Sequence, residues 1–274
     1  MVTDCHWHTT GKETTGEIAQ AIEQAGLDRA ILFAPYIPLG DDAGMPMPEA
    51  NQWMAGVARE LPDRVIGFAW IEPTLPGAVD EVERCVQDYG LRGIKMIPNH
   101  WYPTDEAVFP VYEKIQELQV PIIFHSGILY GYQDGSRFCR PAFYEALINF
   151  PRIRFALAHI SWPWVDECLA VYGRFRHQWH VYHGKRPEVR EIQMYIDTTP
   201  GAPLPWRADA LQKALAFAGE DCLIWGSDAL PGNSQYARQI LESDRRILSQ
   251  QLGVSAATQE KYFGGNLSRF LGRP

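Results

Sequence analysis

Four short apolar segments, far apart in the sequence, each end in side chains that can bind a metal ion. The segments are residues 2–8, 120–125, 153–159 and 223–228, and the side chains at their ends are His6 and His8, His125, His159 and Asp228. Apolar runs of this length, bounded by turn residues, indicate buried strands. A parallel α/β barrel builds its site at the C-terminal ends of its strands. The pattern therefore predicts one metal site at the mouth of such a barrel.

The whole chain alternates expected strands with expected helices. Strands are expected at residues 2–6, 29–34, 64–70, 91–97, 120–125, 153–158, 192–197 and 222–227. Helices are expected at residues 14–25, 48–61, 76–89, 106–118, 141–149, 162–174, 207–218 and 234–251, and Thr14 with Glu17 forms a capping box at the first. This alternation predicts an α/β fold, a (β/α)8 TIM barrel, as one domain over residues 1–274. An open doubly wound sheet is the alternative, but it usually has a glycine-rich turn after its first strand, where this chain has His-Trp-His.

Composition narrows the classes of partner. The 274 residues carry a formal net charge of −8 at pH 7 and show no basic stripe, so nucleic acid is not expected as a partner. No apolar stretch approaches the ~20 residues of a membrane span, and no signal peptide is expected at the start. Five scattered cysteines without a C-x-x-C pair favour a reduced, cytoplasmic setting. We expect a small-molecule substrate. The alternative that the chain forms a homo-oligomer stays open.

Residues 175–191 contain three further histidines, His177, His180 and His183. This segment follows an expected helix and precedes an expected strand, so it should lie at the N-terminal end of the barrel. It is predicted to extend the sixth helix or to make a subunit contact. We therefore do not expect these histidines to take part in the chemistry.

The spacing of His6 and His8 favours a single shared ion. Residues i and i+2 of a strand point to the same side, so both imidazoles can reach one metal. Imidazole nitrogen suits zinc and neighbouring transition metals. Asp4 is expected on the same side but deeper, where it could accept a hydrogen bond from a ligating imidazole.

Taken together, these motifs resemble the amidohydrolase superfamily. The matching residues are Asp4-x-His6-x-His8, Gly93-Ile94-Lys95, His125, the run from Ala158 to Glu167, Gly226-Ser227-Asp228 and the run from Gly264 to Leu271. The last run resembles the C-terminal helix of that superfamily. Within it, the chain looks like the amidohydrolase-related group, which includes lactone and ester hydrolases and also decarboxylases of the aminocarboxymuconate-semialdehyde type.

The resemblance implies one divalent ion, of the zinc type, held by His6, His8, His125 and Asp228. Three neutral imidazoles and one carboxylate leave the ion a net positive charge, which lowers the pKa of bound water toward ~7. Asp228 is then expected both as a ligand and as the catalytic base that takes the proton of that water. His159 is expected beside the ion, where it polarises the substrate. In relatives with two metals the equivalent histidine is a ligand, and that alternative stays open.

Lys95 has three alternative roles. It is predicted to bind a substrate carboxylate or to support a ligand, because a lysine inside a barrel is costly unless it is paired or functional. The resemblance also allows a carboxylated lysine that bridges two metals. An outward lysine with its charge in solvent is the third alternative.

Aromatic residues are frequent in the segments expected at the mouth. They are Trp7, Trp70, Trp101, Tyr102, Tyr130, Tyr132, Trp162 and Trp164. Together they suggest a pocket for a flat or apolar substrate, with Trp7 among its contacts. Arg140 is expected to pair with a substrate carboxylate.

The expected activity is that of a metal-dependent hydrolase. Its substrate would be a small lactone, ester or amide that bears a carboxylate. The alternative is a non-oxidative decarboxylase of an unsaturated or aromatic acid, because the same metal ligands serve both reactions. His6-Trp7-His8 and His159-Ile160-Ser161 lack features that many decarboxylases of this group have, which favours hydrolysis. A barrel that binds a metal without catalysis is a third alternative.

Overall fold

A computed structural model describes residues 1–36 and 45–272 of the chain. In this part, eight parallel strands pair in sequence order. They are β1 (Thr3–Trp7), β2 (Arg29–Phe33), β3 (Val65–Trp70), β4 (Gly93–Met96), β5 (Ile122–Phe124), β6 (Phe155–Leu157), β7 (Met194–Asp197) and β8 (Leu223–Ile224). Backbone hydrogen bonds from Cys5 to Trp225 (2.9 Å) and from His8 to Ala229 (2.8 Å) join the first strand to the last. The predicted (β/α)8 TIM barrel is therefore confirmed.

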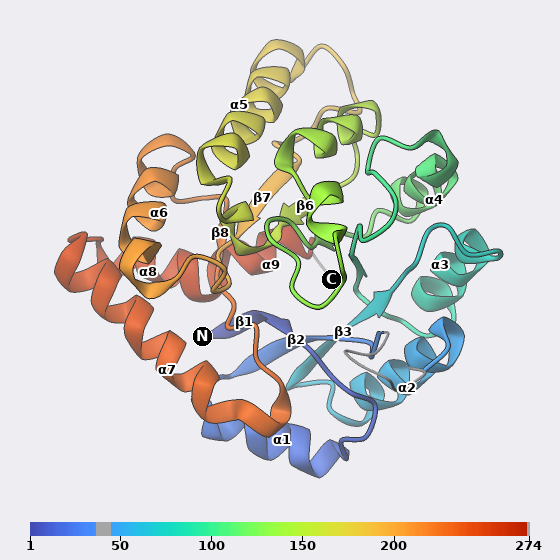
Figure 1. Cartoon of the computed structure of the whole chain (residues 1–274), viewed down its shortest axis with the longest axis horizontal. Helices are drawn as coiled ribbons and strands as arrows, with labels where there is room; N and C mark the ends of the chain where they lie inside the picture. The colour runs from blue at the N-terminus through green and yellow to red at the C-terminus, as the bar shows by residue number, and fades with distance from the viewer. Residues whose placement is uncertain (37–44, 273–274) are drawn as a thin grey trace.

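Helices surround the strands, as Figure 1 shows. In the described residues the α-helices are α1 (Thr15–Gln24), α2 (Met47–Glu60), α3 (Ala78–Gln87), α4 (Phe109–Leu118), α5 (Val165–Tyr182), α6 (Leu204–Phe217), α7 (Ser234–Arg246), α8 (Ala256–Glu260) and α9 (Asn266–Phe270). The expected capping box is present, because Thr14 and Glu17 each accept a backbone N–H from the other. The helix expected at 141–149 is a 3-10 helix, Pro141–Asn149.

Helix α5 is longer than expected and ends at Tyr182. It therefore includes His177 and His180, and His183 is its C-terminal cap. All three side chains are exposed. The helix leads from the C-terminal end of β6 toward the start of β7, so these histidines lie at its far end from the β6 terminus. The interpretation as a helix extension is confirmed, whereas a subunit contact stays a prediction.

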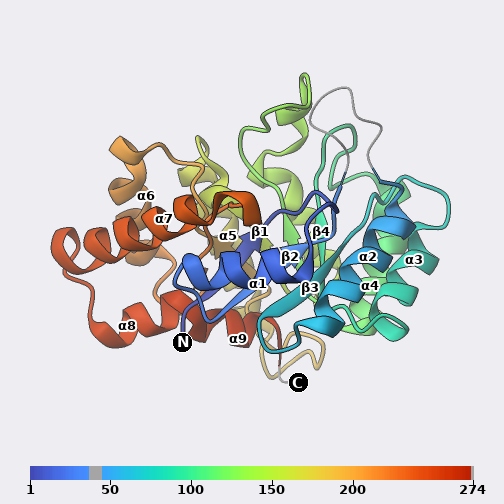
Figure 2. The ribbon, with the colours of Figure 1, turned by 90° about the horizontal axis from the view of Figure 1, so that it is seen from below.

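Side chains of alternate strand positions fill the barrel interior. One buried cluster unites Cys5, Ile31, Phe33, Ile66, Phe68, Ile123, Ala156, Tyr195 and Ile224 with Leu267 and Phe270 of α9. Figure 2 shows α9 and the N-terminus at one end of the barrel, and the green loop after β5 at the other. The C-terminal helix thus closes one end with apolar side chains, which leaves the opposite end for a polar site.

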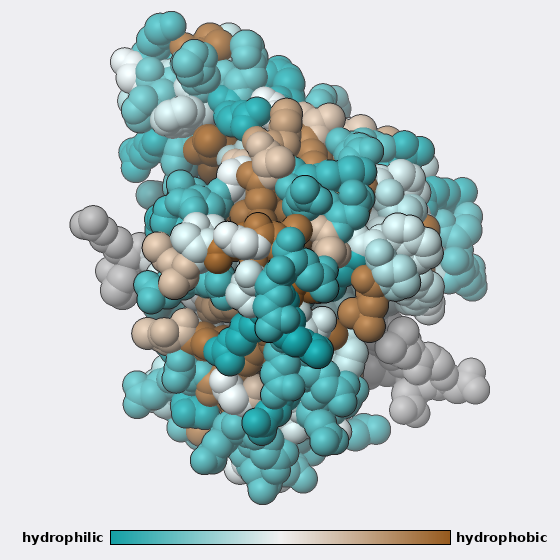
Figure 3. All heavy atoms as spheres, turned by 90° about the vertical axis from the view of Figure 1, so that its left-hand side faces the viewer, coloured by the Kyte–Doolittle hydropathy of each residue, from teal (hydrophilic) through white to brown (hydrophobic). Residues whose placement is uncertain are grey.

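The outer surface mixes polar and apolar side chains. Figure 3 shows this mixture on the face that lies at the left of Figure 1, over α6 and α7. Exposed apolar side chains of α6 include Leu204, Trp206 and Phe217. Among the residues described, no helix has both the length and the apolar character that crossing a bilayer requires.

Candidate metal centre

Asp228 lies between His6 and His8 just beyond the end of β8. Its Oδ1 is 2.9 Å from Nε2 of His8 and 3.4 Å from Nε2 of His6. The backbone fixes this position, because the N–H of Asp228 donates to the carbonyl of His6 and the residue has a left-handed φ of 61°. The side chain of His6 is fully buried, whereas those of His8 and Asp228 are 19% and 30% exposed. The cluster is therefore open on the side of His8.

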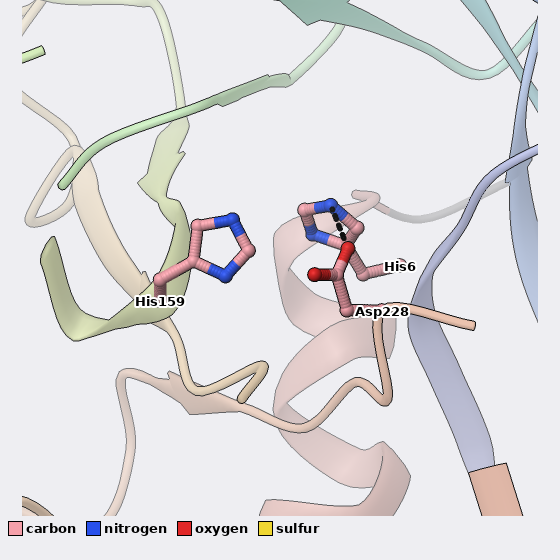
Figure 4. A group of neighbouring side chains, drawn as sticks. All are labelled: His6, His159 and Asp228. Carbon is pink, nitrogen blue, oxygen red and sulfur yellow. Dashed lines mark ion pairs between the residues drawn. The ribbon is translucent and has the colours of Figure 1, made fainter. Parts of the chain in front are cut away.

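His159 completes a set of possible ligands from the opposite side of the barrel. One ligand atom each of His6, His159 and Asp228 lie within 4.8 Å of one another, and Figure 4 shows the three side chains pointing toward a common centre. The ring of His125 is 4.9 Å from that of His159, centroid to centroid. The structure thus brings all five strand-end residues of the sequence prediction to one end of the barrel.

The ring nitrogens of these histidines fit a metal site. In His6 the Nδ1 atom is 2.6 Å from a carboxylate oxygen of Asp197, and in His8 it is 3.0 Å from the hydroxyl of Tyr36. The Nε2–H of His125 donates to the carbonyl of Ile128 at 3.1 Å. One nitrogen of each ring is thus held by the protein, and in His6 and His8 the other nitrogen lies beside Oδ1 of Asp228, where a bound ion would take the place of that contact.

His159 is held in an unusual backbone conformation. Together with Ile160 and Ser161 it forms a run of three left-handed residues, with φ values of 65°, 47° and 54°. Such values cost roughly 1 kcal/mol or more for each residue that is not glycine. Hydrogen bonds hold the run, including one from Ser126 to Ser161 at 2.8 Å. Strain of this kind gathers at functional sites, which is consistent with a role for His159.

Lys95 points into the barrel and is fully buried. Its Nζ lies 3.3 Å from Nε2 of His6 and 4.7 Å from the centre of the Phe33 ring. Burial lowers the pKa of Lys95 to about 8, although the charges of Asp197 and Asp228 oppose this shift. The alternative of an outward lysine is therefore wrong, and the amine belongs to the site.

Electrostatics keep the imidazoles of His6, His125 and His159 neutral and Asp228 ionised. Burial lowers the pKa of His6 and His125 well below the ordinary value, with further contributions from Lys95 and His159 respectively. Burial also lowers the pKa of His159. For Asp228 burial acts to raise the pKa, but the His8 hydrogen bond and nearby imidazoles outweigh it and hold the pKa well below its usual value. Neutral nitrogen donors and a carboxylate are what a divalent ion of the zinc type binds.

Asp4 does not hold an imidazole, contrary to the expectation from strand alternation. Its Oδ1 accepts the backbone N–H groups of His6 (2.9 Å) and Ser227 (3.0 Å), and its Oδ2 accepts the indole N–H of Trp7. The pairing of β1 with β2 shifts register between Asp4 and Trp7, which changes the direction of the side chains there. Asp4 thus joins β1 to β8, and Asp197 is the carboxylate that holds His6.

Trp7 and Arg140, which were expected to contact the substrate, contact other protein groups in the structure. Trp7 is fully buried in the main core, and its indole N–H donates to Asp4 and Ser227. This leaves no surface for a substrate, so Trp7 is a packing residue and not the contact that was expected. The side chain of Arg140 is 49% exposed and pairs with Glu167. A substrate role for Arg140 stays a prediction.

Three residues near the ligands were not expected from the sequence. They are Asp197 and Thr199 at the end of β7 and Tyr36 after β2. Asp197 follows the apolar run Met194-Tyr195-Ile196 in the same way as the strand-end ligands follow theirs. The same pattern could therefore have identified Asp197, whereas no local signal marks Thr199 or Tyr36.

A parallel barrel with histidines and a carboxylate at its strand ends is typical of metal-dependent barrel enzymes. A family model described as amidohydrolase matches residues 3–273. The chain therefore belongs to the amidohydrolase family, as its sequence motifs indicated.

Curated relatives of this chain are lyases by name. A 2-keto-4-carboxy-3-hexenedioate hydratase from a Sphingobium species is 27% identical in an alignment of 176 positions that covers 54% of this chain and 49% of the relative. A 2-amino-3-carboxymuconate-6-semialdehyde decarboxylase from Dictyostelium discoideum is 23% identical in an alignment of 250 positions that covers 81% of this chain and 65% of the relative. The aligned parts thus cover about half and about two thirds of these relatives.

Solved structures support the fold over nearly the full length. The 5-carboxyvanillate decarboxylase of Sphingomonas paucimobilis superposes with a TM-score of 0.72 and 17% identity, covering 98% of both chains. A 2,6-dihydroxybenzoate decarboxylase in complex with 2,6-dihydroxybenzoate gives a TM-score of 0.67 at 17% identity, again covering 98% of both chains. At these identities the comparison shows the fold alone.

We expect one divalent ion per chain, with His125 among its ligands. Replacing His125 with Ala should lower metal occupancy strongly, because it removes one of four ligands. Elemental analysis after gel filtration measures the occupancy. His177→Ala, an exposed histidine of α5, is the matched control and should keep the ion. Two ions per chain would contradict this prediction and favour a carboxylated Lys95.

Proposed function

We propose that this protein is a metal-dependent lyase that removes a carboxyl group from an unsaturated or aromatic acid without an oxidant. The observation that carries the proposal is the buried amine of Lys95, 3.3 Å from His6 at the candidate metal centre. A buried amine beside a cation site suits a substrate with negative charge. The names of the two curated relatives, both lyases of unsaturated carboxylates, favour this class over hydrolysis.

His6, His8, His125 and Asp228 would hold the ion in this proposal. A bound divalent ion would supply positive charge that attracts oxygen atoms of the substrate and stabilises negative charge on it. We expect zinc from the imidazole-rich donor set. One solved relative, a dihydroxybenzoic acid decarboxylase, is described with bound manganese, so both metals enter the tests.

Loss of carbon dioxide requires a proton for the carbon that keeps the electron pair. When the bond to the carboxylate breaks, its electrons stay on that carbon, and a proton must reach it. His159 is the candidate donor, because Thr199 occupies its Nδ1 and its Nε2 is left to carry a proton. Lys95 would pair with a second carboxylate of the substrate. His159 would regain its proton from solvent by way of Asp228, which is itself ionised at rest.

Hydrolysis, the activity expected from the sequence, is the second candidate. The observation that favours it is the position of the ionised carboxylate of Asp228, 2.9 Å from Nε2 of His8 and 3.4 Å from Nε2 of His6. In that reaction Asp228 would take a proton from water that attacks a lactone or ester carbonyl. The ligands are common to both reactions, so only products distinguish them.

The reaction class can be tested with the protein loaded separately with zinc and with manganese. Aromatic hydroxy acids, unsaturated dicarboxylates, lactones and esters are supplied, and carbon dioxide, acid release and loss of conjugation are recorded. We expect carbon dioxide and, in D2O, one deuterium on the carbon that lost its carboxylate. Protein stripped with a chelator is the control. Acid release from lactones without carbon dioxide would establish the hydrolase, and loss of conjugation alone a hydratase.

A further inference from the structure

The segment after β7 contacts two imidazoles of the site, although β7 supplies none of the proposed ligands. A carboxylate oxygen of Asp197 lies 2.6 Å from Nδ1 of His6, and the hydroxyl of Thr199 lies 3.1 Å from Nδ1 of His159. Asp197 and Thr199 are fully buried. Each contact fixes the ring on its Nδ1 side and leaves Nε2 to face the centre of the site.

We propose that Asp197 and Thr199 are positioning residues that together set the distance between the metal centre and the proton donor. Asp197 orients His6 as a ligand, and Thr199 orients His159 toward the substrate. The role of His159 in this inference rests on the proposed function, whereas the role of Asp197 depends only on metal binding.

One hydrogen bond connects the two contacts. The second carboxylate oxygen of Asp197 accepts the backbone N–H of Thr199 at 2.9 Å. The same carboxylate therefore holds the ring of His6 and the backbone that carries the hydroxyl of Thr199. A short turn of this type restricts both residues to one arrangement, so the two imidazoles are linked through three consecutive residues.

Close packing around two glycines also restricts this region to one arrangement, independently of its hydrogen bonds. A Cβ atom on Gly226 would lie 2.6 Å from Cγ2 of Thr199 and 2.9 Å from Cβ of His6. A Cβ atom on Gly201 would lie 2.4 Å from Cβ of His159. Both positions thus admit only glycine unless the neighbours move, because Gly226 lies close to both Thr199 and His6 and Gly201 packs against His159.

The neighbouring threonine provides a matched control. Thr198 is also fully buried, but its hydroxyl bonds to the carbonyl of Ile224 (3.2 Å) and the hydroxyl of Tyr262 (2.7 Å). Replacing either threonine with valine removes one buried hydroxyl and keeps the shape. Only the change at Thr199 removes a contact with the site.

The experiment compares four variants of the full chain. Asp197→Asn should weaken Zn²⁺ binding ~10–100-fold, the range for losing a partner of a ligating histidine, measured by competition with a coloured chelator. Thr199→Val should bind Zn²⁺ within about twofold of the parent but turn over ~10-fold or more slowly with KM little changed, as expected when a proton donor is misplaced. Thr199→Ser should restore turnover, and Thr198→Val should change neither quantity.

A spectroscopic readout keeps this test independent of the reaction. The ¹⁵N shifts of the His159 ring report its tautomer, which should change in Thr199→Val and not in Thr198→Val.

Four outcomes would contradict parts of the proposal. Unchanged Zn²⁺ affinity in Asp197→Asn would overturn the role of Asp197 whatever the reaction is. An unchanged tautomer in Thr199→Val, or equal turnover in the two valine variants, would overturn the role of Thr199. An equal loss of Zn²⁺ affinity in Thr199→Val and Asp197→Asn would indicate that His159 is a ligand. It would also overturn the proposal that Asp197 orients a ligand whereas Thr199 orients the proton donor. If Zn²⁺ affinity and the His159 tautomer change as expected but the parent protein releases no carbon dioxide, only the proposed function is refuted.

Discussion

Replacing Asp228 with Asn is expected to lower turnover by ~10²–10⁴-fold, the range typical of losing a general base or acid. The substitution keeps the size of the side chain and one oxygen that can bind a metal. It removes the negative charge that lies 2.9 Å from His8 and 3.4 Å from His6. Turnover must be measured at saturating metal, because loss of charge also weakens binding. Metal content should fall much less than turnover, since the three proposed histidine ligands remain.

The matched control is Asp221→Asn. Asp221 is an exposed residue that pairs with Lys261 and Arg269, and its replacement should leave turnover near that of the parent. Near-normal turnover of Asp228→Asn in the fully loaded state would refute the role of Asp228 in proton transfer. Asp228 would then be a ligand only, and His159 would be the first candidate for the transferring group.

The barrel could be predicted because each strand is a short apolar run between turn residues. Runs such as Ile122–Phe124 and Phe155–Leu157 are buried on both sides, so they lack the polar alternation of a surface strand. The type of helix at residues 141–149 could not be predicted, because a short apolar segment after Pro141 does not distinguish an α-helix from the 3-10 helix found there. The extension of α5 beyond residue 174 was only one of two alternatives for residues 175–191, since its last turns carry exposed histidines instead of an apolar stripe.

The shared location of the candidate ligands could be predicted because strand ends meet at the mouth of a barrel. His125 and His159 come together from neighbouring strands for this reason. Contacts that depend on three-dimensional detail could not be predicted. The register shift in β1 turned Asp4 toward the backbone of Ser227, and the contact of Thr199 with His159 joins residues 40 positions apart without any motif.

The reaction could not be predicted from the ligands, because a metal, a base and an imidazole serve hydrolysis and decarboxylation equally. Sequence differences around His6 and His159 favoured hydrolysis, whereas the names of the relatives favour a lyase. The buried charge of Lys95 is the feature that restricts the substrate in either case. Its replacement therefore tests what the site binds independently of what the site does.

Replacing Lys95 with Met is expected to lower kcat/KM by ~10²-fold or more while the folded protein becomes more stable. The amine is fully buried, and its nearest polar contact is a neutral imidazole, His6, at 3.3 Å. Burial of this charge costs free energy that the charges of Asp197 and Asp228 offset only in part, as the lowered pKa of Lys95 indicates. An apolar side chain of similar length should therefore raise the free energy of unfolding by roughly 1–3 kcal/mol. The substrate, in contrast, would lose the cation that pairs with its carboxylate, which is worth about 2–5 kcal/mol when buried.

Opposite changes in stability and activity are the signature of a residue retained for binding. Thermal unfolding and steady-state kinetics of the metal-loaded protein measure the two quantities. Lys114→Met is the control, because Lys114 pairs with Glu83 and Glu117 on the outer helices and its loss should not change kcat/KM. A Lys95→Met protein that is less stable and equally active would show that the amine supports the fold. A KM that is unchanged while metal binding is lost would instead place Lys95 among the groups that hold the ion.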